Sequence, residues 1–302
     1  MPIEDPETEE HCVHHWVLEK PIGGYTPASC KKCGIARDFT PRPKMSPRGR
    51  PAGITADEER ERYALLCQAI ALTDLSVETR EVRPAPDVEV KSLPCRIERM
   101  DRVADDVMAV FLRLPAVEEF NYRPGQYLDV MLSGGRRRSF SIASAPGDGR
   151  LIELHVRRAS KSGFTGQLFD SMQSGTLLRI EGPLGQFWFR NESPRPPLFV
   201  GGGTGYAPLR AMLRQLVAAG DRRPVTLYWG ARGVPDLYEH AWLEDLQRQR
   251  PGFSYRPVLS GPTADDAVPW TGRRGLVHEA VLAELPNLAG FDVYASGPPA
   301  MI

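Results

Sequence analysis

The sequence VGGGTGYAP at residues 200–208 decides how the last third of the chain folds. It lies between a short apolar run at 198–200, which predicts a strand, and an amphipathic stretch at 208–219, which predicts a helix ending near Gly220. Pro208 fits the first helical turn, because its missing N–H costs little there. Glycines let backbone amides approach an anion, and the helix start adds partial positive charge. The turn predicts a phosphate site, with an ordinary tight turn as the alternative, over Gly201, Gly202, Gly203, Thr204 and Gly205.

Strands and helices alternate downstream of this turn. Strands are predicted at residues 225–229, 254–259 and 291–295, and helices at 238–250 and 275–285. The alternation predicts a parallel, doubly wound α/β sheet, which binds ligands at the carboxyl ends of its strands. Two further strand ends carry glycine, at residues 228–232 and 295–301. The chain stops at Ile302, where another helix and an edge strand are expected, so we expect this domain to be truncated at its carboxyl end.

The segment before this turn has a different pattern of apolar residues and prolines. Proline-rich breaks at 40–51, 83–86 and 193–197 divide the chain, and the segment between the last two contains short strand-like runs. Their spacing predicts an antiparallel sandwich or barrel with one helix at 165–172, capped by Thr165. The strands are predicted at residues 95–100, 107–114, 126–132, 139–142, 151–157 and 176–181.

Composition excludes several classes of protein. The 38 basic and 38 acidic side chains cancel, which argues against nucleic acid as the main partner. No apolar run approaches the roughly 20 residues of a membrane helix, and the acidic start lacks a secretory leader, so we expect a cytoplasmic protein without membrane contact. Five cysteines in such a chain predict reduced thiols or metal ligands rather than disulfides. Cys95 is expected to be a packed thiol.

The barrel segment carries a motif of its own at residues 138–141, RSFS. On a strand, Arg138 and Phe140 share one face. An arginine can bind a phosphate in a bidentate manner, and an aromatic ring offers a flat surface to a ring system. The alternative is a basic edge strand that discourages aggregation.

From about Leu93 onward, these motifs in this order resemble the ferredoxin–NADP reductase superfamily. The likeness is to NADH-dependent reductase components of oxygenases and to the CDP-6-deoxy-glucoseen reductase type. The resemblance implies a flavin-binding antiparallel β-barrel at residues 92–192 and a nicotinamide-binding α/β domain at 193–302. It also implies the cofactors FAD and NADH.

The resemblance implies roles for the flavin motifs. Arg138 would bind the flavin phosphate, Phe140 would stack in place of the usual tyrosine, and Ser141 would lie near flavin N5 as a catalytic residue. A second motif at 162–165 places Thr165 at the pyrophosphate. The remaining flavin-binding candidates are Ser139, His155, Val156, Arg157 and Gly163.

On the nicotinamide side, the resemblance makes residues 201–208 the pyrophosphate turn. Residues 296–301, SGPPAM, resemble the segment beside the nicotinamide, with the catalytic candidate Ser296 in place of cysteine and with Gly297, Pro298 and Met301 as binding candidates. Asp236 suits a free ribose hydroxyl and repels a 2′-phosphate, which favours NADH, whereas Arg232 leaves NADPH possible.

The amino-terminal region permits two metals. Tetrahedral zinc would be held by Cys12, Cys30, Cys33 and one histidine, His14 or His15, in a zinc-ribbon-like module over residues 1–41. Residues 42–84 would be a linker and a partial ferredoxin-type segment. A 2Fe–2S cluster would use Cys30, Cys33 and Cys67, but Tyr25 occupies the position of its first ligand. A chain without metal is the third possibility.

These observations predict a flavin-dependent oxidoreductase that transfers a hydride from NADH to FAD and single electrons to a partner, an oxygenase or an iron–sulfur protein. The alternative is a zinc-ribbon adaptor whose reductase half binds nucleotides without turnover.

Overall fold

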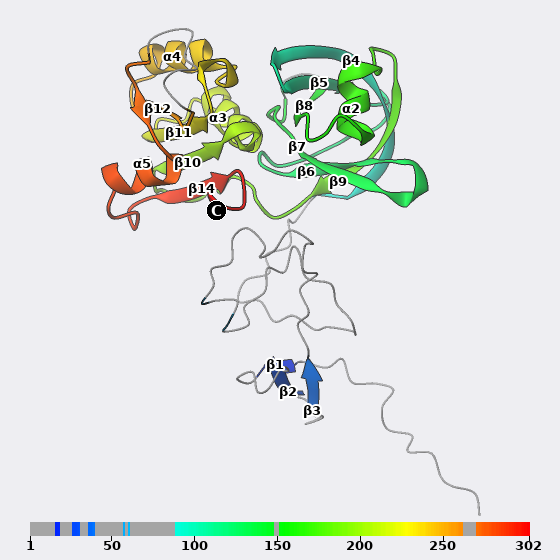
Figure 1. The fold of residues 1–302 in the computed structure, drawn as a ribbon, viewed down its shortest axis with the longest axis horizontal. Helices are drawn as coiled ribbons and strands as arrows, with labels where there is room; N and C mark the ends of the chain where they lie inside the picture. The colour runs from blue at the N-terminus through cyan, green and yellow to red at the C-terminus, as the bar shows by residue number, and fades with distance from the viewer. Residues whose placement is uncertain are drawn as a thin grey trace, which may run out of the picture. The chain divides into compact units, whose positions relative to one another are not determined.

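The computed structural model divides the chain into two compact units, Met1–Arg83 and Pro84–Ile302 (Figure 1). The second unit is described over residues 88–147, 151–261 and 270–302. In the first, the description covers the backbone of three strands and the two positions Asp57 and Arg60.

The first unit contains a small antiparallel sheet in the order β1-β2-β3. Its strands are β1 (Trp16–Leu18), β2 (Thr26–Cys30) and β3 (Ala36–Phe39). Trp16 pairs with Cys30, and Ser29 pairs with Ala36. The start of β1, the end of β2 and the start of β3 therefore lie at one end of the sheet.

The second unit begins with a six-stranded antiparallel sheet in the order β7-β6-β9-β4-β5-β8. A bridge between Ile142 and Leu154 connects its two outer strands and closes the sheet, which confirms the predicted antiparallel barrel. The strands are β4 (Lys91–Ala104), β5 (Val107–Arg113), β6 (Tyr127–Met131), β7 (Arg137–Ser141), β8 (Leu151–Arg157) and β9 (Leu177–Leu184).

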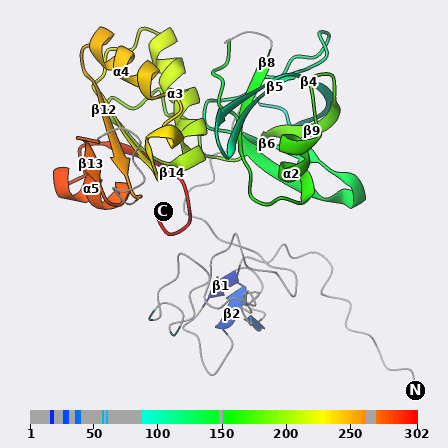
Figure 2. The same cartoon turned by 45° about the horizontal axis from the view of Figure 1, so that its top comes forward.

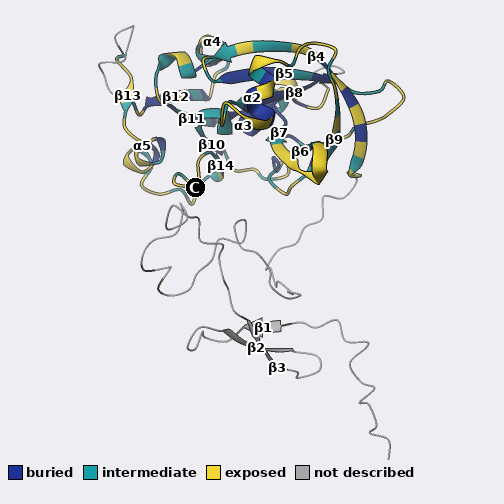
Figure 3. Ribbon diagram, turned by 45° about the vertical axis from the view of Figure 1, so that its right-hand side comes forward, coloured by how far each residue is buried: buried dark blue, intermediate teal, exposed yellow. Residues whose placement is uncertain are grey.

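Apolar side chains fill the barrel, and along β4 the buried Leu93, Cys95 and Ile97 alternate with exposed residues, as the period of a β-strand predicts. β5 and β8 are buried along most of their length, whereas the first three residues of β7 are exposed (Figure 3). Cys95 is 3% exposed, and burial raises the pKa of its thiol to about 12, so the expected packed thiol is confirmed.

One helix, α2 (Gly163–Asp170), crosses the barrel segment. It begins two residues before the predicted start, because Ser162 is the N-cap residue. The prediction that Thr165 caps this helix is wrong: Thr165 lies inside the first turn and is 9% exposed.

The rest of the unit is a five-stranded parallel sheet in the order β13-β12-β11-β10-β14. Its strands are β10 (Pro197–Gly202), β11 (Val225–Ala231), β12 (Phe253–Leu259), β13 (Arg273–Arg274) and β14 (Asp292–Ser296). The helices are α3 (Tyr206–Ala218), α4 (His240–Gln249) and α5 (Val277–Glu284). The two-residue strand β13 was not predicted.

Alternate residues of β10 face opposite layers. Phe199 packs in the cluster that includes Leu213 of α3 and Leu243 of α4, whereas Val200 packs with Val281 of α5. Helices therefore cover both faces of the sheet (Figure 2), which confirms the doubly wound prediction. None of the helices in the described residues has the length and apolar character needed to cross a membrane.

Candidate functional site

The glycine turn lies between β10 and α3 and includes a short 3-10 helix, η2 (Gly203–Gly205). Gly203 has φ +54°, a backbone conformation that side chains with a Cβ rarely adopt. A Cβ on Gly202 would lie 2.8 Å from Cδ of Pro298 and 2.9 Å from Sδ of Met301. Glycine is therefore needed because the loop after β14 packs directly on the turn. This brings two of the predicted nicotinamide-side motifs together.

Helix α3 begins at Tyr206, two residues earlier than predicted. Pro208 is consequently the third residue of the helix rather than the first, but it still lies in the turn whose N–H groups have no partner within the helix. Gly201 and Pro208 are buried, whereas residues 202–205 are partly exposed. The accessible part of the turn is thus the part that can meet a ligand.

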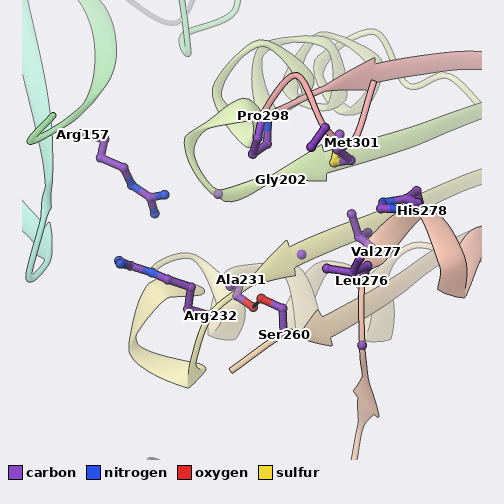
Figure 4. Close-up of a pocket in the computed structure, with 14 residues that line it drawn as sticks. Arg157, Gly202, Ala231, Arg232, Ser260, Leu276, Val277, His278, Pro298 and Met301 are labelled. Atoms are coloured by element: carbon purple, nitrogen blue, oxygen red, sulfur yellow. Dashed lines mark hydrogen bonds between the residues drawn. The ribbon is translucent and has the colours of Figure 1, made fainter. Parts of the chain in front are cut away.

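A cavity of about 220 Å³ opens at the carboxyl ends of the parallel strands, where ligands bind in such sheets. Arg157 of β8 lies on one side of it with Arg232, and Figure 4 shows their guanidinium groups facing each other across from Leu276 and His278. His278, the second residue of α5 (Val277–Glu284), is partly exposed and also lines this cavity. The other lining residues are Gly202, Gly203, Gly230, Ala231, Ser260, Gly275, Val277, Pro298, Ala300 and Met301.

Arg157 connects the barrel to the glycine turn. A Cβ on Gly203 would lie 2.9 Å from Nη1 of Arg157, so the guanidinium lies directly against the turn. Its Nε is buried and has no hydrogen-bond partner among the described residues. Its nearest carboxylate is that of Asp106, whose Oδ2 lies 3.5 Å from this Nε as an ion-pair partner. A guanidinium beside a left-handed glycine suits a phosphate ligand.

Arg232 pairs with two carboxylates. Its Nη2 lies 2.8 Å from Oδ2 of Asp106, and its Nε lies 3.2 Å from Oδ2 of Asp236 in η3 (Val234–Asp236). The hydrogen bond to Asp236 raises the pKa of Arg232, and Asp106 adds to this effect. Arg232 and Asp236, predicted as separate determinants of coenzyme choice, therefore form one cluster.

A second cluster lies in the interior between the barrel and the sheet. Arg210 of α3 is 6% exposed, and its Nη1 donates to Oε2 of Glu153 and to the carbonyl oxygen of Ala143, at 2.8 and 2.9 Å. Its Nε donates to Glu239 at 2.8 Å. Burial alone would raise the pKa of Glu153, but the hydrogen bond with His155 and the charge of Arg210 outweigh it and lower that pKa. None of these charges was singled out from the sequence.

His155 belongs to this buried cluster. Its Nε2 lies 3.0 Å from Glu153, and its Nδ1 lies 2.9 Å from the hydroxyl of Tyr238. His155 is 6% exposed and its neighbour Val156 is 1% exposed. The flavin-binding roles of both residues stay predictions. Glu153, His155 and Arg157 share the face of β8 that points toward the parallel sheet, whereas Val156 lies on the opposite face, in the barrel core.

An aromatic stack connects the buried cluster to the glycine turn. The Tyr206 ring stacks on Trp229 with centroids 4.0 Å apart, and its hydroxyl donates to Glu239 at 2.7 Å. Trp229 Nε1 donates to the carbonyl oxygen of Gly203 at 2.9 Å. Through Trp229 of β11, the stack therefore holds the glycine turn in place.

The two predicted flavin motifs lie side by side on the barrel. The ring centroids of Phe140 in β7 and Phe164 in α2 are 5.7 Å apart. Gly163 opens α2 with φ +79°. Ser139 donates to Asp129 at 2.6 Å. A flat ring system next to a helix start fits the chemistry expected of a flavin site.

The neighbouring arginines of β7 have different partners. Arg137 forms an ion pair with Glu181, whereas Arg138 donates to the carbonyl oxygen of Arg137 at 3.1 Å. Within the described part of the chain, no carboxylate pairs with Arg138. Its charge is therefore available to a ligand. The predicted catalytic residues Ser141 and Ser296 are both partly exposed, and their roles stay predictions.

The predicted metal ligands fall in the first unit. Cys30 is the last residue of β2, and Cys12, His15 and Cys33 lie outside the described residues. Over the residues that the structure does describe, no group of three or more potential ligands is close enough to hold a metal ion.

Comparison with known proteins assigns both halves of the second unit. Residues 94–189 match the oxidoreductase FAD-binding domain, and residues 199–302 match the oxidoreductase NAD-binding domain. A CDP-6-deoxy-L-threo-D-glycero-4-hexulose-3-dehydrase reductase from Yersinia pseudotuberculosis is 36% identical over 249 residues, which cover 82% of this chain and 74% of the relative. The reductase subunit of an aromatic O-demethylase from Amycolatopsis is 32% identical over 288 residues, covering 93% and 84%.

A solved structure has the same arrangement. The crystal structure of a cytochrome P450 reductase from Amycolatopsis superimposes with a TM-score of 0.65 at 32% identity, covering 82% of this chain and 73% of that one. The barrel, the parallel sheet, the glycine turn and these relatives all point to the same family. The chain therefore belongs to the ferredoxin–NADP reductase superfamily and is an oxidoreductase with an FAD-binding and an NAD-binding domain.

Proposed function

We propose that the protein oxidises NADH with FAD and passes the electrons singly to a partner redox protein. The observation that carries the proposal is Arg157, which belongs to the FAD-binding barrel but lies against Gly203 of the nucleotide turn. The two domains thereby share one wall of the coenzyme cavity. A cofactor on the barrel and a coenzyme in the sheet can meet only where such a shared boundary exists.

Each side of the site has residues suited to its ligand. On the nicotinamide side, the first amides of α3 would bind the pyrophosphate, and Arg157, which the resemblance assigns to the flavin, would lie between the flavin and the glycine turn. On the barrel side, Arg138 would hold the flavin phosphate, Phe140 would pack on the ring system, and Gly163 with Thr165 would face the flavin pyrophosphate. Bound FAD supplies the step from a two-electron hydride to single electrons.

Ser141 and Ser296 complete the proposal. Ser141 ends β7, and Ser296 ends β14 beside the glycine turn. We place these hydroxyls at the flavin N5 edge and beside the nicotinamide, where each can orient its ring by a hydrogen bond. We also retain the boundaries 1–41, 42–84, 92–192 and 193–302. The two family matches support the last two ranges, and the division at Arg83 supports a boundary near residue 84.

The acceptor class comes from the relatives. One is a reductase of a hexulose dehydrase and one is a reductase subunit of an O-demethylase. By analogy, the acceptor of this protein would be an oxygenase or an iron–sulfur protein that takes one electron at a time. The analogy does not extend to a particular substrate.

The experiment compares the two adjacent arginines of β7. Purified protein reconstituted with FAD should reduce a one-electron dye with NADH. Arg138→Ala should weaken FAD binding by about tenfold to a hundredfold, because it removes a charge-assisted hydrogen bond worth roughly 1.5–3 kcal/mol. Arg137→Ala is the control, since Arg137 already pairs with Glu181. FAD-loaded protein that fails to oxidise NADH would refute the function, and equal FAD affinity of both variants would refute the site.

The amino-terminal sheet leads to a separate proposal about metal. Cys30 ends β2 opposite Trp16, which directly follows His15 in the sequence, and Cys33 lies in the connection between β2 and β3. In sequence, the candidate ligands therefore directly precede β1, end β2 and precede β3. We infer that residues 1–41 bind zinc rather than a 2Fe–2S cluster.

Zinc has no redox chemistry, so this module would not relay electrons. Metal analysis should find zinc without iron or sulfide. Cys30→Ser should release it while leaving NADH-dependent dye reduction intact. Stoichiometric iron and sulfide, with an electron paramagnetic resonance signal on reduction that Cys67→Ser abolishes, would reverse the assignment.

A further inference from the structure

Asp106 lies in the tight turn between β4 and β5 of the FAD-binding barrel. Its carboxylate nevertheless contacts arginines that line the coenzyme cavity in the NAD-binding half. We propose that Asp106 is a specificity residue, supplied by the flavin domain, that makes the protein prefer NADH to NADPH. The inference rests on the proposed function and identifies the coenzyme class that this site accepts.

The contacts place one carboxylate between two guanidinium groups. Oδ2 of Asp106 lies 2.8 Å from Nη2 of Arg232 and 3.5 Å from Nε of Arg157. The main-chain oxygen of Asp106 also accepts a hydrogen bond from the N–H of Arg158, at 2.8 Å. The turn is therefore fixed to β8, and the position of the carboxylate is set by backbone as well as by charge.

The charges of this cluster cancel. Arg157 and Arg232 carry two positive charges, and Asp106 and Asp236 carry two negative charges. A 2′-phosphate adds nearly two negative charges to the coenzyme, so it needs a cation that is not already paired. With both arginines engaged by carboxylates, the cluster offers such a phosphate no net attraction and places Asp106 where it repels one.

The cluster lies at the end of β11, where the choice between NADH and NADPH is expected to be made. Arg232 directly follows β11, the second strand of the sheet after the glycine turn. In doubly wound nucleotide-binding sheets, the end of this strand meets the adenine ribose, and an acidic or basic side chain there selects between a hydroxyl and a phosphate. The FAD-binding barrel thus contributes a side chain to a choice usually left to the nucleotide domain.

Two buried atoms of the cluster lack hydrogen-bond partners among the residues that the structure describes, which supports a role in binding the coenzyme. Oδ1 of Asp106 and Nε of Arg157 are buried, and neither has a hydrogen-bond partner within the described ranges. Nearly all buried polar atoms in folded proteins are paired. We expect a coenzyme that enters the cavity to supply hydrogen-bond partners for these two atoms.

The test compares Asp106→Asn with Asp105→Asn in the FAD-loaded full chain. Asn preserves the shape of residue 106 but removes its charge, and Asp105 is its exposed neighbour in the same turn. The readout is the ratio of kcat/KM for NADPH to that for NADH. We expect Asp106→Asn to raise this ratio by about tenfold, from the loss of one repelling charge near a doubly charged phosphate. Asp105→Asn should leave the ratio unchanged.

Further variants make the test specific. Asp106→Glu keeps the charge and should keep the preference for NADH. Asp106→Asn/Arg232→Ala should lose the gain, because the released cation is absent. A parent protein that prefers NADPH, or a ratio that changes less than twofold in Asp106→Asn, would overturn the proposal.

Binding measurements separate this inference from the proposed function. The inhibitory fragment 2′,5′-ADP and its control 5′-AMP bind without hydride transfer, so calorimetry can be run even on a protein that never oxidises NADH. Asp106→Asn should tighten 2′,5′-ADP binding relative to 5′-AMP by about tenfold, on the same electrostatic ground. Equal changes for both fragments would refute the role of Asp106, whether or not the protein is a reductase.

Discussion

Two arginine–carboxylate clusters join the FAD-binding barrel to the NAD-binding sheet, and they differ in burial. Arg210 is 6% exposed between Glu153 and Glu239, whereas the side chain of Arg232 is 63% exposed beside Asp106. A buried charge that loses its partner is strongly destabilising, but an exposed charge is solvated by water. The same pairing chemistry should therefore fix the orientation of the two domains in one place and tune ligand selection in the other.

The largest effect is expected from removing the buried cation. Arg210→Met leaves the buried Glu153 and the partly buried Glu239 without this counter-charge, which should lower the free energy of unfolding by about 3–5 kcal/mol. The matched change Arg232→Met should cost less than about 1 kcal/mol, because Arg232 is exposed. Urea unfolding of both variants measures the difference.

A triple variant sharpens this contrast. If the cost of Arg210→Met arises from the two unpaired carboxylates, then adding Glu153→Gln and Glu239→Gln should recover much of it. Equal stabilities of the Arg210→Met and Arg232→Met proteins would show that burial does not distinguish the clusters.

The second-largest effect is expected from acid, which should lower the free energy of unfolding through the buried cluster. The pKa of Glu153 is lowered in the folded protein, because the bonds to His155 and Arg210 outweigh its burial. The stabilisation is thus fully present above the unfolded value of about 4.3 and is lost as the pH falls through the lower folded pKa. Unfolding free energies measured from about pH 5.5 to 3 should fall less steeply in Glu153→Gln than in the parent. The exposed control Glu119→Gln should follow the parent, and a parallel decline in all three proteins would contradict the assignment.

Salt should produce the smallest change, and only at the exposed cluster. Raising the salt from 0.1 to 1 M shortens the screening length from about 10 to 3 Å, so the repulsion of a 2′-phosphate by Asp106 should weaken. The parent's ratio of kcat/KM for NADPH to NADH should rise by roughly twofold to threefold, and the ratio for Asp106→Asn should rise less. A salt response that is identical in the two proteins would show that the Asp106 carboxylate is not its cause.

Local patterns were enough to predict most elements of the second unit. The apolar alternation of residues 151–157 coincides with β8, and the glycine turn at 200–208 was correctly placed between a strand and a helix. Both features depend on neighbouring residues: strand alternation has a period of two, and a glycine turn is recognisable from its own composition. Helix ends were less accurate: α2 and α3 each begin two residues before the predicted start, at Gly163 and Tyr206, and within these described helices neither N-cap residue makes a side-chain capping hydrogen bond.

The candidate site was only partly predictable for a related reason. Arg232 and Asp236 could be found, since they follow a predicted strand at the edge where ligands bind. Asp106 gave no signal, because an acidic residue in a hairpin turn is typical of any exposed turn. The place of His278 at the cavity could not be predicted either, because it depends on where α5 packs.

The sequence by itself determined the class of this protein. The order of an RSFS strand, a glycine turn and an SGPPAM strand end specifies a barrel followed by a doubly wound sheet, because each motif depends on residues close together in the chain. Only the tertiary structure decided which charges meet. Arg210 lies 57 residues from Glu153, and Arg232 lies 126 residues from Asp106. Pairs so distant in sequence form when two independently patterned domains pack together, and no local pattern records that packing.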